Sequence, residues 1–557
     1  MSIIKTLLVG LDAACWEYVG PLVRSGRMPT LKKLMDTGCS GTLRSTLPAA
    51  TPVAWSSIIT GKNPGKHGVF DMMWRRPGSY QLSLTNNQAR RGRPFWRRLN
   101  EAGLRVGLVN VPFTYPPQPV DGFVVCGFGS PSTAANLTYP AGIQRQLAQR
   151  YGRFEPTINS KLFRKGRQPD ILQAEIAHQK QLVEIACDLA DQYQVQVLVM
   201  NLMLPDHANH KMSNMADVEE ALCQSDADAG RLIERFRPDN ILLISDHGSR
   251  RLQGDFLLQV WLRDNDYTVW QRRNPAGHQQ ALNWVIMEWL KKGQGLSGRP
   301  EQGLRWLMRQ TLNRLPANRL WQQLEKKVPL ARDHVTWASR LDYAQSSLFF
   351  GNRSSGLLYL NIAGRDPAGL IPPAQVPTLT ERLISQLSQI QDPTGRPVLG
   401  GIYPKAELYH GPVLAQAPDL ILDIYQSPWN TITAYRRQAI AEVADGRYFA
   451  ANRDNYGWHS RDGLFAFSGP AFDTGRSQLT GHVMDIPATL LYLHNVPIPA
   501  DYDGQVLRAG LRPEQLTNQP IQQQPGEPDM GEAIPVSYTD GENEELVGHL
   551  RALGYVD

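Results

Sequence analysis

Short apolar runs alternate along the chain with longer amphipathic stretches. Two stretches with apolar residues at helical spacing, 174–192 and 218–236, predict helices. Because strands and helices alternate, we expect an α/β fold with helices on both faces of a mainly parallel sheet. Runs rich in Val, Ile and Leu predict the buried strands Thr6–Leu11, Arg105–Val111, Val195–Leu202, Asn240–Ser245 and Leu464–Ser468.

The composition is that of a globular protein. Of the 557 residues, 42% are hydrophobic and 20% are charged, which excludes disorder, collagen or coiled coil for the whole chain. A net charge of +6 is modest at this length, and there is no nucleic-acid-binding motif. We find neither a signal peptide nor an apolar run long enough to span a membrane. Five widely spread cysteines without CxxC spacing indicate reduced thiols, so we predict a cytoplasmic protein.

Two segments depart from the alternating pattern. Residues 281–340 carry 11 Lys and Arg against 4 Asp and Glu, with five of the 13 tryptophans. We therefore expect a basic, Trp-rich helical insertion at 266–340 between two parts of one catalytic domain, 1–265 and 341–510. The insertion is either a helical layer packed on the core or a cap. A cap would attract anionic substrates or contact a membrane surface. Residues 511–557, with five prolines, predict a linker and a short C-terminal helix.

Seven residues follow predicted strands or stand at sharp corners. Taken singly, each Asp is more often a helix cap and each His more often a buried structural residue. Together they are expected at one edge of the sheet, because the carboxyl ends of parallel strands meet there. Carboxylate and imidazole suit Zn²⁺ or Mn²⁺, and two such sets would hold two metal ions, with Zn²⁺ preferred. The seven are Asp12, Thr51, Asp206, His210, Asp246, His247 and His459.

Thr51 opens a predicted ten-residue helix. We expect Thr51 at the N-cap, Pro52 at the first helical position and Gly61 after the last turn. A hydroxyl at a helix N-terminus would lie beside backbone N–H groups that favour a phosphate.

Two further histidines are expected outside the ligand set. The D-x-x-x-H spacing places Asp206 and His210 one helical turn apart, which leaves His207 outside the ligand set. The corner PGKHG favours a structural turn for His67.

The motifs around these residues resemble those of the alkaline phosphatase superfamily. They come closest to its type I phosphodiesterase/nucleotide pyrophosphatase branch, in the bacterial predicted phosphohydrolase-or-phosphomutase group. The resemblance runs in order over nearly the whole chain to the terminal LRALGYVD. It implies an alkaline-phosphatase-like α/β/α sandwich. The motifs are LDAACW, TPVAWSSIITGKNPGKHGVFD, PDHANH, SDHG and GWHSRDGLFAFSGPAF.

The resemblance also implies roles. Asp206, His210 and His459 would hold one metal ion. Asp12, Asp246 and His247 would hold the other, together with the Thr51 hydroxyl. Thr51 would be the nucleophile and form a phospho-threonine intermediate on a small phosphorylated substrate.

One position departs from the family pattern. Nucleotide pyrophosphatases have a phosphate-binding Asn three residues after the nucleophile, where this chain has Ala54. The sequence leaves four alternative donors: the Thr51 backbone, Asn209, Arg250 or Arg251.

The sequence predicts a metal-dependent phosphohydrolase of the phosphodiesterase/nucleotide pyrophosphatase type. The alternative is a phosphomutase with the same two-metal site. A sulfatase is disfavoured because the Cys/Ser-x-Pro-x-Arg motif is missing. A non-catalytic binding protein on the same scaffold is a further reading that the full ligand set disfavours. The oligomeric state is left open.

Overall fold

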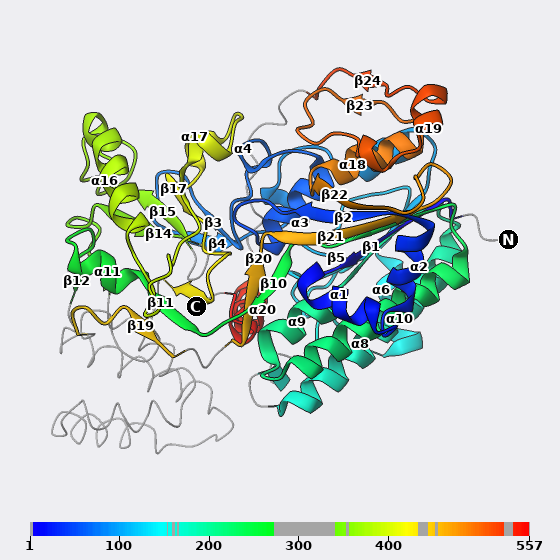
Figure 1. The fold of residues 1–557 in the computed structure, drawn as a ribbon, viewed down its shortest axis with the longest axis horizontal. Coiled ribbons are helices and arrows are strands. Elements are labelled where there is room, and N and C mark those ends of the chain that lie inside the picture. The colour runs from blue at the N-terminus through cyan, green and yellow to red at the C-terminus, as the bar shows by residue number, and fades with distance from the viewer. Residues whose placement is uncertain are drawn as a thin grey trace, which may run out of the picture.

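The computed structural model describes residues 4–152, 154–158, 162–163, 166–271, 340–351, 356–432, 444–451, 455–527 and 538–555. Across these residues the largest sheet has nine strands, in the order β22-β2-β21-β9-β1-β8-β5-β6-β7 (Figure 1). Its strands are β1 (Thr6–Leu11), β2 (Gly38–Arg44), β5 (Val106–Val111), β6 (Gly122–Cys126), β7 (Thr138–Tyr139), β8 (Val197–Leu202), β9 (Asn240–Ile244), β21 (Asp462–Ser468) and β22 (Arg476–His482).

The sheet is mainly parallel. Strands β9, β1, β8, β5 and β6 run parallel to one another, and β22 runs parallel to β2. Strand β21 is antiparallel to both β2 and β9. It begins where β9 ends, since the Ser245 N–H bonds the Leu464 carbonyl, and therefore runs in the opposite direction. All five predicted strands lie in this sheet, which confirms the α/β prediction.

Helices cover both faces of the sheet (Figure 1). The two predicted helices lie within α8 and α10, both of which begin earlier than expected. Helix α8 begins with Pro169 in its first turn, and α10 is capped by the Asn214 side chain, which accepts from the Ala216 and Asp217 N–H groups. One layer contains α1 (Trp16–Arg24), α2 (Pro29–Thr37), α8 (Gln168–Tyr193) and α10 (Met215–Phe236), and the other contains α3 (Thr51–Thr60), α5 (Phe95–Glu101) and α18 (Asp485–Leu493).

A smaller antiparallel sheet lies beside the large one (Figure 1). Helix α16 (Val376–Ser388) packs on it. Arg461, directly before β21, forms an ion pair with Asp423 next to the smaller sheet, with 3.6 Å between Nη1 and Oδ2. Its strands, in spatial order, are β14 (Leu348–Phe350), β15 (Leu357–Leu360), β17 (Leu420–Leu422) and β16 (Ile402–Pro404).

The predicted insertion falls largely outside the described residues. The short strands β12 (Trp270–Gln271) and β13 (Arg340–Leu341) pair antiparallel and bring residues 271 and 340 side by side. Residues 272–339 lie outside the described part of the chain, so both readings of the insertion stay predictions. Near the C-terminus, helix α20 (Asp540–Leu553) lies against α9 (Leu204–Lys211). Among the described residues, no helix is both long and apolar enough to cross a bilayer.

Candidate active site

The site forms where three neighbouring parallel strands end. The register pairs Leu11 with Leu202 and Gly10 with Ile244, so β1, β8 and β9 end at one level. Asp12 directly follows β1, Asp206 lies in helix α9 after β8, and Asp246 follows β9. These strands consist almost wholly of buried apolar residues, which fixes the backbone from which the carboxylates project.

A two-stranded ladder positions His459, which lies in it, and His247, which directly precedes it. Strand β10 (Gly248–Arg251) pairs antiparallel with β20 (Gly457–Ser460), and Ser249 lies opposite His459. His459 lies within β20, and β21 follows it. The rings of His247 and His459 stack with centroids 3.9 Å apart, so the ladder joins the two predicted ligand sets.

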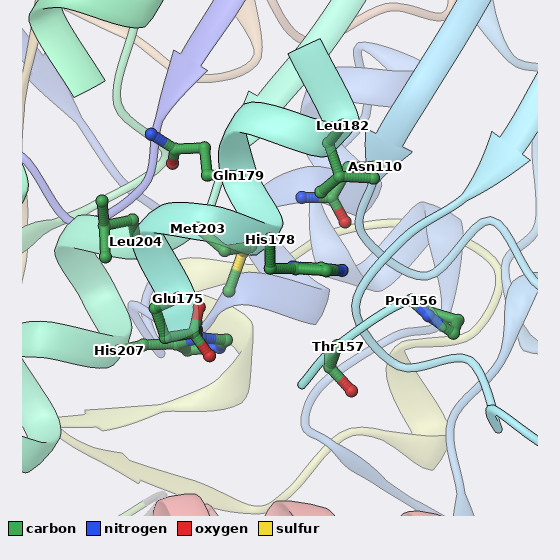
Figure 2. A pocket seen from close by; sticks show the side chains of 10 residues that line it. All are labelled: Asn110, Pro156, Thr157, Glu175, His178, Gln179, Leu182, Met203, Leu204 and His207. Carbon is green, nitrogen blue, oxygen red and sulfur yellow. Dashed lines mark ion pairs between the residues drawn. The ribbon is translucent and has the colours of Figure 1, made fainter. Parts of the chain in front are cut away.

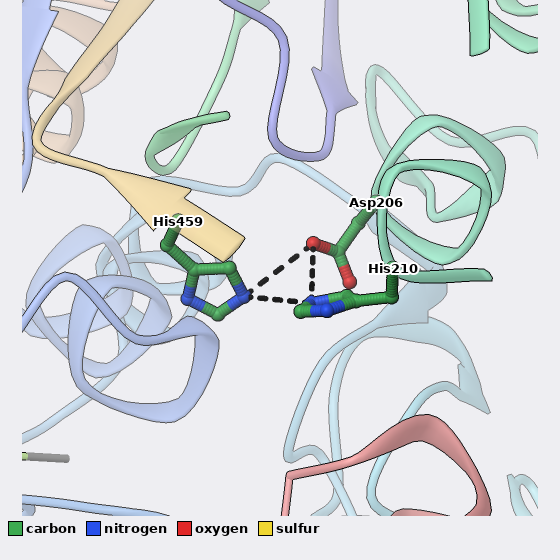
Figure 3. A group of neighbouring side chains, drawn as sticks. All are labelled: Asp206, His210 and His459. Atoms are coloured by element: carbon green, nitrogen blue, oxygen red, sulfur yellow. Dashed lines mark hydrogen bonds and ion pairs between the residues drawn. The ribbon is translucent and has the colours of Figure 1, made fainter. Parts of the chain in front are cut away.

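The first set is compact (Figure 3). The Nε2 atoms of His210 and His459 are 3.1 Å apart. Both face Oδ1 of Asp206, at 3.4 Å from His210 Nε2 and 3.5 Å from His459 Nε2. Asp206 and His210 are one turn apart on α9, as the spacing predicted. All three side chains are buried.

The second set lies around His247. Its Nε2 is 3.3 Å from Asp246 Oδ2 and 3.7 Å from Asp12 Oδ1. The Thr51 hydroxyl is 3.1 Å from the same nitrogen. The structure thus brings all seven predicted side chains together, with the ligand atoms of each three-residue set within 4.8 Å of one another.

Thr51 does not cap its helix, contrary to the prediction. Helix α3 begins at Thr51, and its N-cap is Ala50, whose backbone is extended at φ −130° and ψ 136°. Pro52 therefore occupies the second position, while Gly61 ends the helix in the left-handed conformation as expected. Because the Thr51 hydroxyl makes no capping bond, it is directed to His247 instead.

The buried carboxylates fit divalent cations. Within the described residues, Oδ1 of Asp12 and both carboxylate oxygens of Asp246 accept no hydrogen bond. Burial and the charges of Asp246 and Asp206 raise the pKa of Asp12 well above its usual value. Burial and Asp206 raise the pKa of Asp246 to about 8. Such groups ionise readily only beside positive charge, which a metal ion supplies.

Backbone carbonyls set the histidine tautomers. His459 Nδ1 donates to the Ala49 carbonyl at 2.8 Å, and His247 Nδ1 donates to the Gly248 carbonyl at 3.2 Å. Both Nε2 atoms are thereby left as acceptors that face the carboxylates. Burial, together with His459, lowers the pKa of His247 well below its usual value. Neutral imidazole is the form that binds a metal ion.

Asn201 is a residue of the candidate site that the sequence did not predict. Its Nδ2 donates to Asp12 Oδ2 at 2.8 Å and orients that carboxylate. Gly10 makes room for it, because a Cβ there would lie 2.2 Å from Asn201 Oδ1. The only signal in the sequence is a polar residue inside the apolar strand β8.

His207 and His67 lie outside both ligand sets, as expected. His207 points into a small cavity and pairs with Glu175, with 3.1 Å between Nδ1 and Oε2. His67 is buried between Ser57, whose Oγ is 3.0 Å from Nε2, and the Val69 N–H. Figure 2 shows the cavity, which is lined by Asn110, Pro156, Thr157, Glu175, His178, Gln179, Leu182, Met203, Leu204 and His207.

Three of the four alternative phosphate donors already donate hydrogen bonds to backbone carbonyls. The Arg250 guanidinium donates to the carbonyls of Ile424, Ser427 and His459. Arg251 donates to the carbonyls of Asn209, Met212 and Ser213. The Asn209 amide donates to the Trp458 carbonyl. These side chains thus bond backbone carbonyls around the site.

Comparisons with known proteins place the chain in a family. No curated protein matches it. A family model described as type I phosphodiesterase / nucleotide pyrophosphatase matches residues 6–436. The chain belongs to this family. The predicted resemblance is confirmed, and so is the prediction of a hydrolase that acts on phosphate ester bonds. Members of the family are metal-dependent, and the two buried sets are candidate metal sites.

Two solved structures are similar over most of their length. Phosphonoacetate hydrolase from Sinorhizobium meliloti 1021, solved with phosphonoacetate, has a TM-score of 0.50 at 13% identity, covering 89% of this chain and 96% of that one. Human ectonucleotide pyrophosphatase / phosphodiesterase 5 has a TM-score of 0.46 at 13% identity, covering 88% and 95%. The first likeness confirms the alkaline-phosphatase-like fold.

The two ligand sets predict two metal ions per chain. We expect elemental analysis of Zn²⁺-saturated, desalted protein to give two ions, and about one in Asp246→Ala or His210→Ala, because each variant loses a ligand of one set. His410→Ala is the control: its side chain is 67% exposed, pairs with Asp503 and lies outside both sets. Fewer than one ion in the parent, or two in both ligand variants, would contradict the assignment.

Proposed function

We propose that this enzyme cleaves a phosphodiester or pyrophosphate bond of a small molecule, with Thr51 as nucleophile. The observation that carries the proposal is the position of the Thr51 hydroxyl. It lies 3.1 Å from His247 Nε2 and at the first turn of a buried helix, near the carboxylates of Asp12 and Asp246, three of whose oxygens accept no hydrogen bond from the described residues. Family membership supports ester hydrolysis at such a site.

The residues fit two Zn²⁺ ions, with Mn²⁺ as the alternative. Asp206, His210 and His459 would hold one ion, and Asp12, Asp246 and His247 the other, beside Thr51. All ligands are nitrogen or oxygen, and thiols are missing from both sets. When bound, the ions would lower the pKa of the Thr51 hydroxyl and neutralise negative charge on the phosphate.

The proposed reaction has two displacements at phosphorus. Thr51 Oγ1 attacks phosphorus as the bond to the leaving oxygen breaks, and the hydroxyl proton ends on the leaving group. Water then cleaves the phospho-threonine ester, which restores the Thr51 hydroxyl and releases the second product.

The first turn of α3 supplies the phosphate donor in this scheme. Pro52 has no N–H, and the N–H groups of Val53 and Ala54 bond the Ala50 carbonyl. The Thr51 N–H has no acceptor within the helix, since it is the first helical residue. It therefore takes the place of the side-chain donor that Ala54 cannot provide, with support from the positive end of the helix dipole.

Thr51 variants test the nucleophile. Thr51→Ala should lower kcat by at least ~10³-fold, since the attacking oxygen is lost, while metal content stays near that of the parent. Thr51→Ser should retain appreciable activity because the hydroxyl remains. Acid quenching and peptide mapping should place the phosphoryl group on Thr51. Unchanged turnover in Thr51→Ala, or a phosphoryl group mapped to another residue, would show that the nucleophile is wrong.

A substrate panel separates hydrolase from phosphomutase. After Zn²⁺ reconstitution, we expect cleavage of a bis-aryl phosphodiester and a nucleotide pyrophosphate, because the family consists of phosphodiesterases. The leaving groups and released phosphate would be quantified beside an aryl monoester. Transfer of phosphate within a phosphorylated sugar or glycerate, without cleavage of the diesters, would instead identify a mutase.

We also propose a cytoplasmic location. All five cysteines are free thiols, and three of them are buried, which suits a reducing compartment. Cell fractionation with antibody detection would test this, and recovery in a secreted or periplasmic fraction would overturn it.

A further inference from the structure

Tyr555, near the end of the chain, lies within the first ligand set. Its hydroxyl donates a hydrogen bond to Oδ2 of Asp206, and the side chain is buried. The phenol ring lies edge-on to His210, with centroids 4.9 Å apart, and its centroid is 5.9 Å from that of His459. A residue about 350 positions beyond Asp206 in sequence thus contacts all three members of the set.

The two oxygens of Asp206 have different partners. Oδ1 faces the Nε2 atoms of His210 and His459. Oδ2 receives the Tyr555 hydroxyl on the other side. The hydrogen bond therefore prevents the carboxylate from rotating and keeps Oδ1 toward the two histidines. Hydrogen bonds of this kind to metal-ligating carboxylates orient the ligand and change metal affinity.

The end of helix α20 fixes Tyr555. Gly554 adopts the left-handed conformation at φ +92°, and the Tyr555 N–H bonds the Leu550 carbonyl at 2.9 Å. A Cβ on Gly554 would lie 2.1 Å from the Asn455 side chain, so only glycine fits. The turn therefore directs the phenol inward, toward α9.

Helix α20 itself is anchored at its N-terminal half. Thr539 and Glu542 form a capping box. The Glu545 carboxylate accepts from the backbone N–H groups of Ser132 and Thr133, at 2.9 and 3.0 Å, and from both hydroxyls. Leu546, Leu550 and Leu553 are buried beneath the helix. These contacts make the C-terminal helix a fixed part of the site wall.

We propose that Tyr555 is a positioning residue for the metal ion held by Asp206, His210 and His459. The inference rests on the proposed function, since it assumes that this set holds a metal ion. It assigns a role to the terminal LRALGYVD motif: the C-terminal helix completes one of the two metal sites and leaves the other unchanged.

The test measures Zn²⁺ affinity directly. Metal-free parent and Tyr555→Phe would be titrated against a chromophoric chelator. We expect one of the two sites to weaken by about 10–100-fold in Tyr555→Phe, as for other residues that orient metal ligands, with the second site unchanged. Activity of the variant should fall at limiting Zn²⁺ and recover at saturating Zn²⁺, which a general folding defect would not allow.

Tyr492→Phe is the matched control. Tyr492 is buried in α18, and its hydroxyl donates to the carbonyls of Gln515 and Gln519, so this variant also loses a buried phenolic hydrogen bond. It should bind both ions as the parent does. A chain ending at Gly554 gives a second probe and should weaken the same site at least as much as Tyr555→Phe.

The same measurements separate the role of Tyr555 from the proposed hydrolase function. If the parent binds two ions and cleaves phosphodiesters while Tyr555→Phe and the shortened chain bind both ions with parental affinity, only the role of Tyr555 is overturned. If the parent binds fewer than two ions or releases no product, the proposed function itself fails, whatever the variants do.

Discussion

The carboxylates of Asp12, Asp206 and Asp246 are buried close together. Two negative charges 4 Å apart repel by about 4 kcal/mol at an effective dielectric constant of 20, so such a group persists only beside positive charge or bound protons. The three carboxylates lie close together because the parallel strands β9, β1 and β8 end at the same edge of the sheet. One carboxylate follows each strand. Metal ions held by the two sets would offset the charge that this arrangement concentrates.

Backbone carbonyls fix the orientation of two histidines that complete the ligand sets. The carbonyls of Ala49 and Gly248 hold His459 and His247 with Nε2 directed at the carboxylates. Arg250 is buried but does not contact the carboxylates; it ties three backbone carbonyls together instead. Thus the charged groups nearest Thr51 are the carboxylates and the cations that they would bind. The two arginines bond backbone carbonyls around the site instead. In this arrangement, bound metal ions rather than arginines would face the negative charge of a phosphate ester.

Much of the fold could be predicted from local patterns. The apolar runs identified five strands of the central sheet because strands buried on both faces are continuous hydrophobic stretches. The ligand set could be proposed because those strands end in Asp and His and because the motifs resemble a family. Asn201 could not be predicted, since one polar residue in an apolar strand is not distinctive by itself. Its role depends on the hydrogen bond from its amide to Asp12.

The sequence by itself determined the strands, the order of the motifs and the identity of the seven candidate side chains, because these depend on residues close together in the chain. Only the tertiary structure decided that Thr51 begins its helix without capping it, since the backbone conformation of Ala50 sets that boundary. Only the tertiary structure brought the Tyr555 hydroxyl to Asp206. It also paired the guanidinium groups of Arg250 and Arg251 with backbone carbonyls around the site. These contacts join segments far apart in sequence, and their geometry follows from packing that no local pattern encodes.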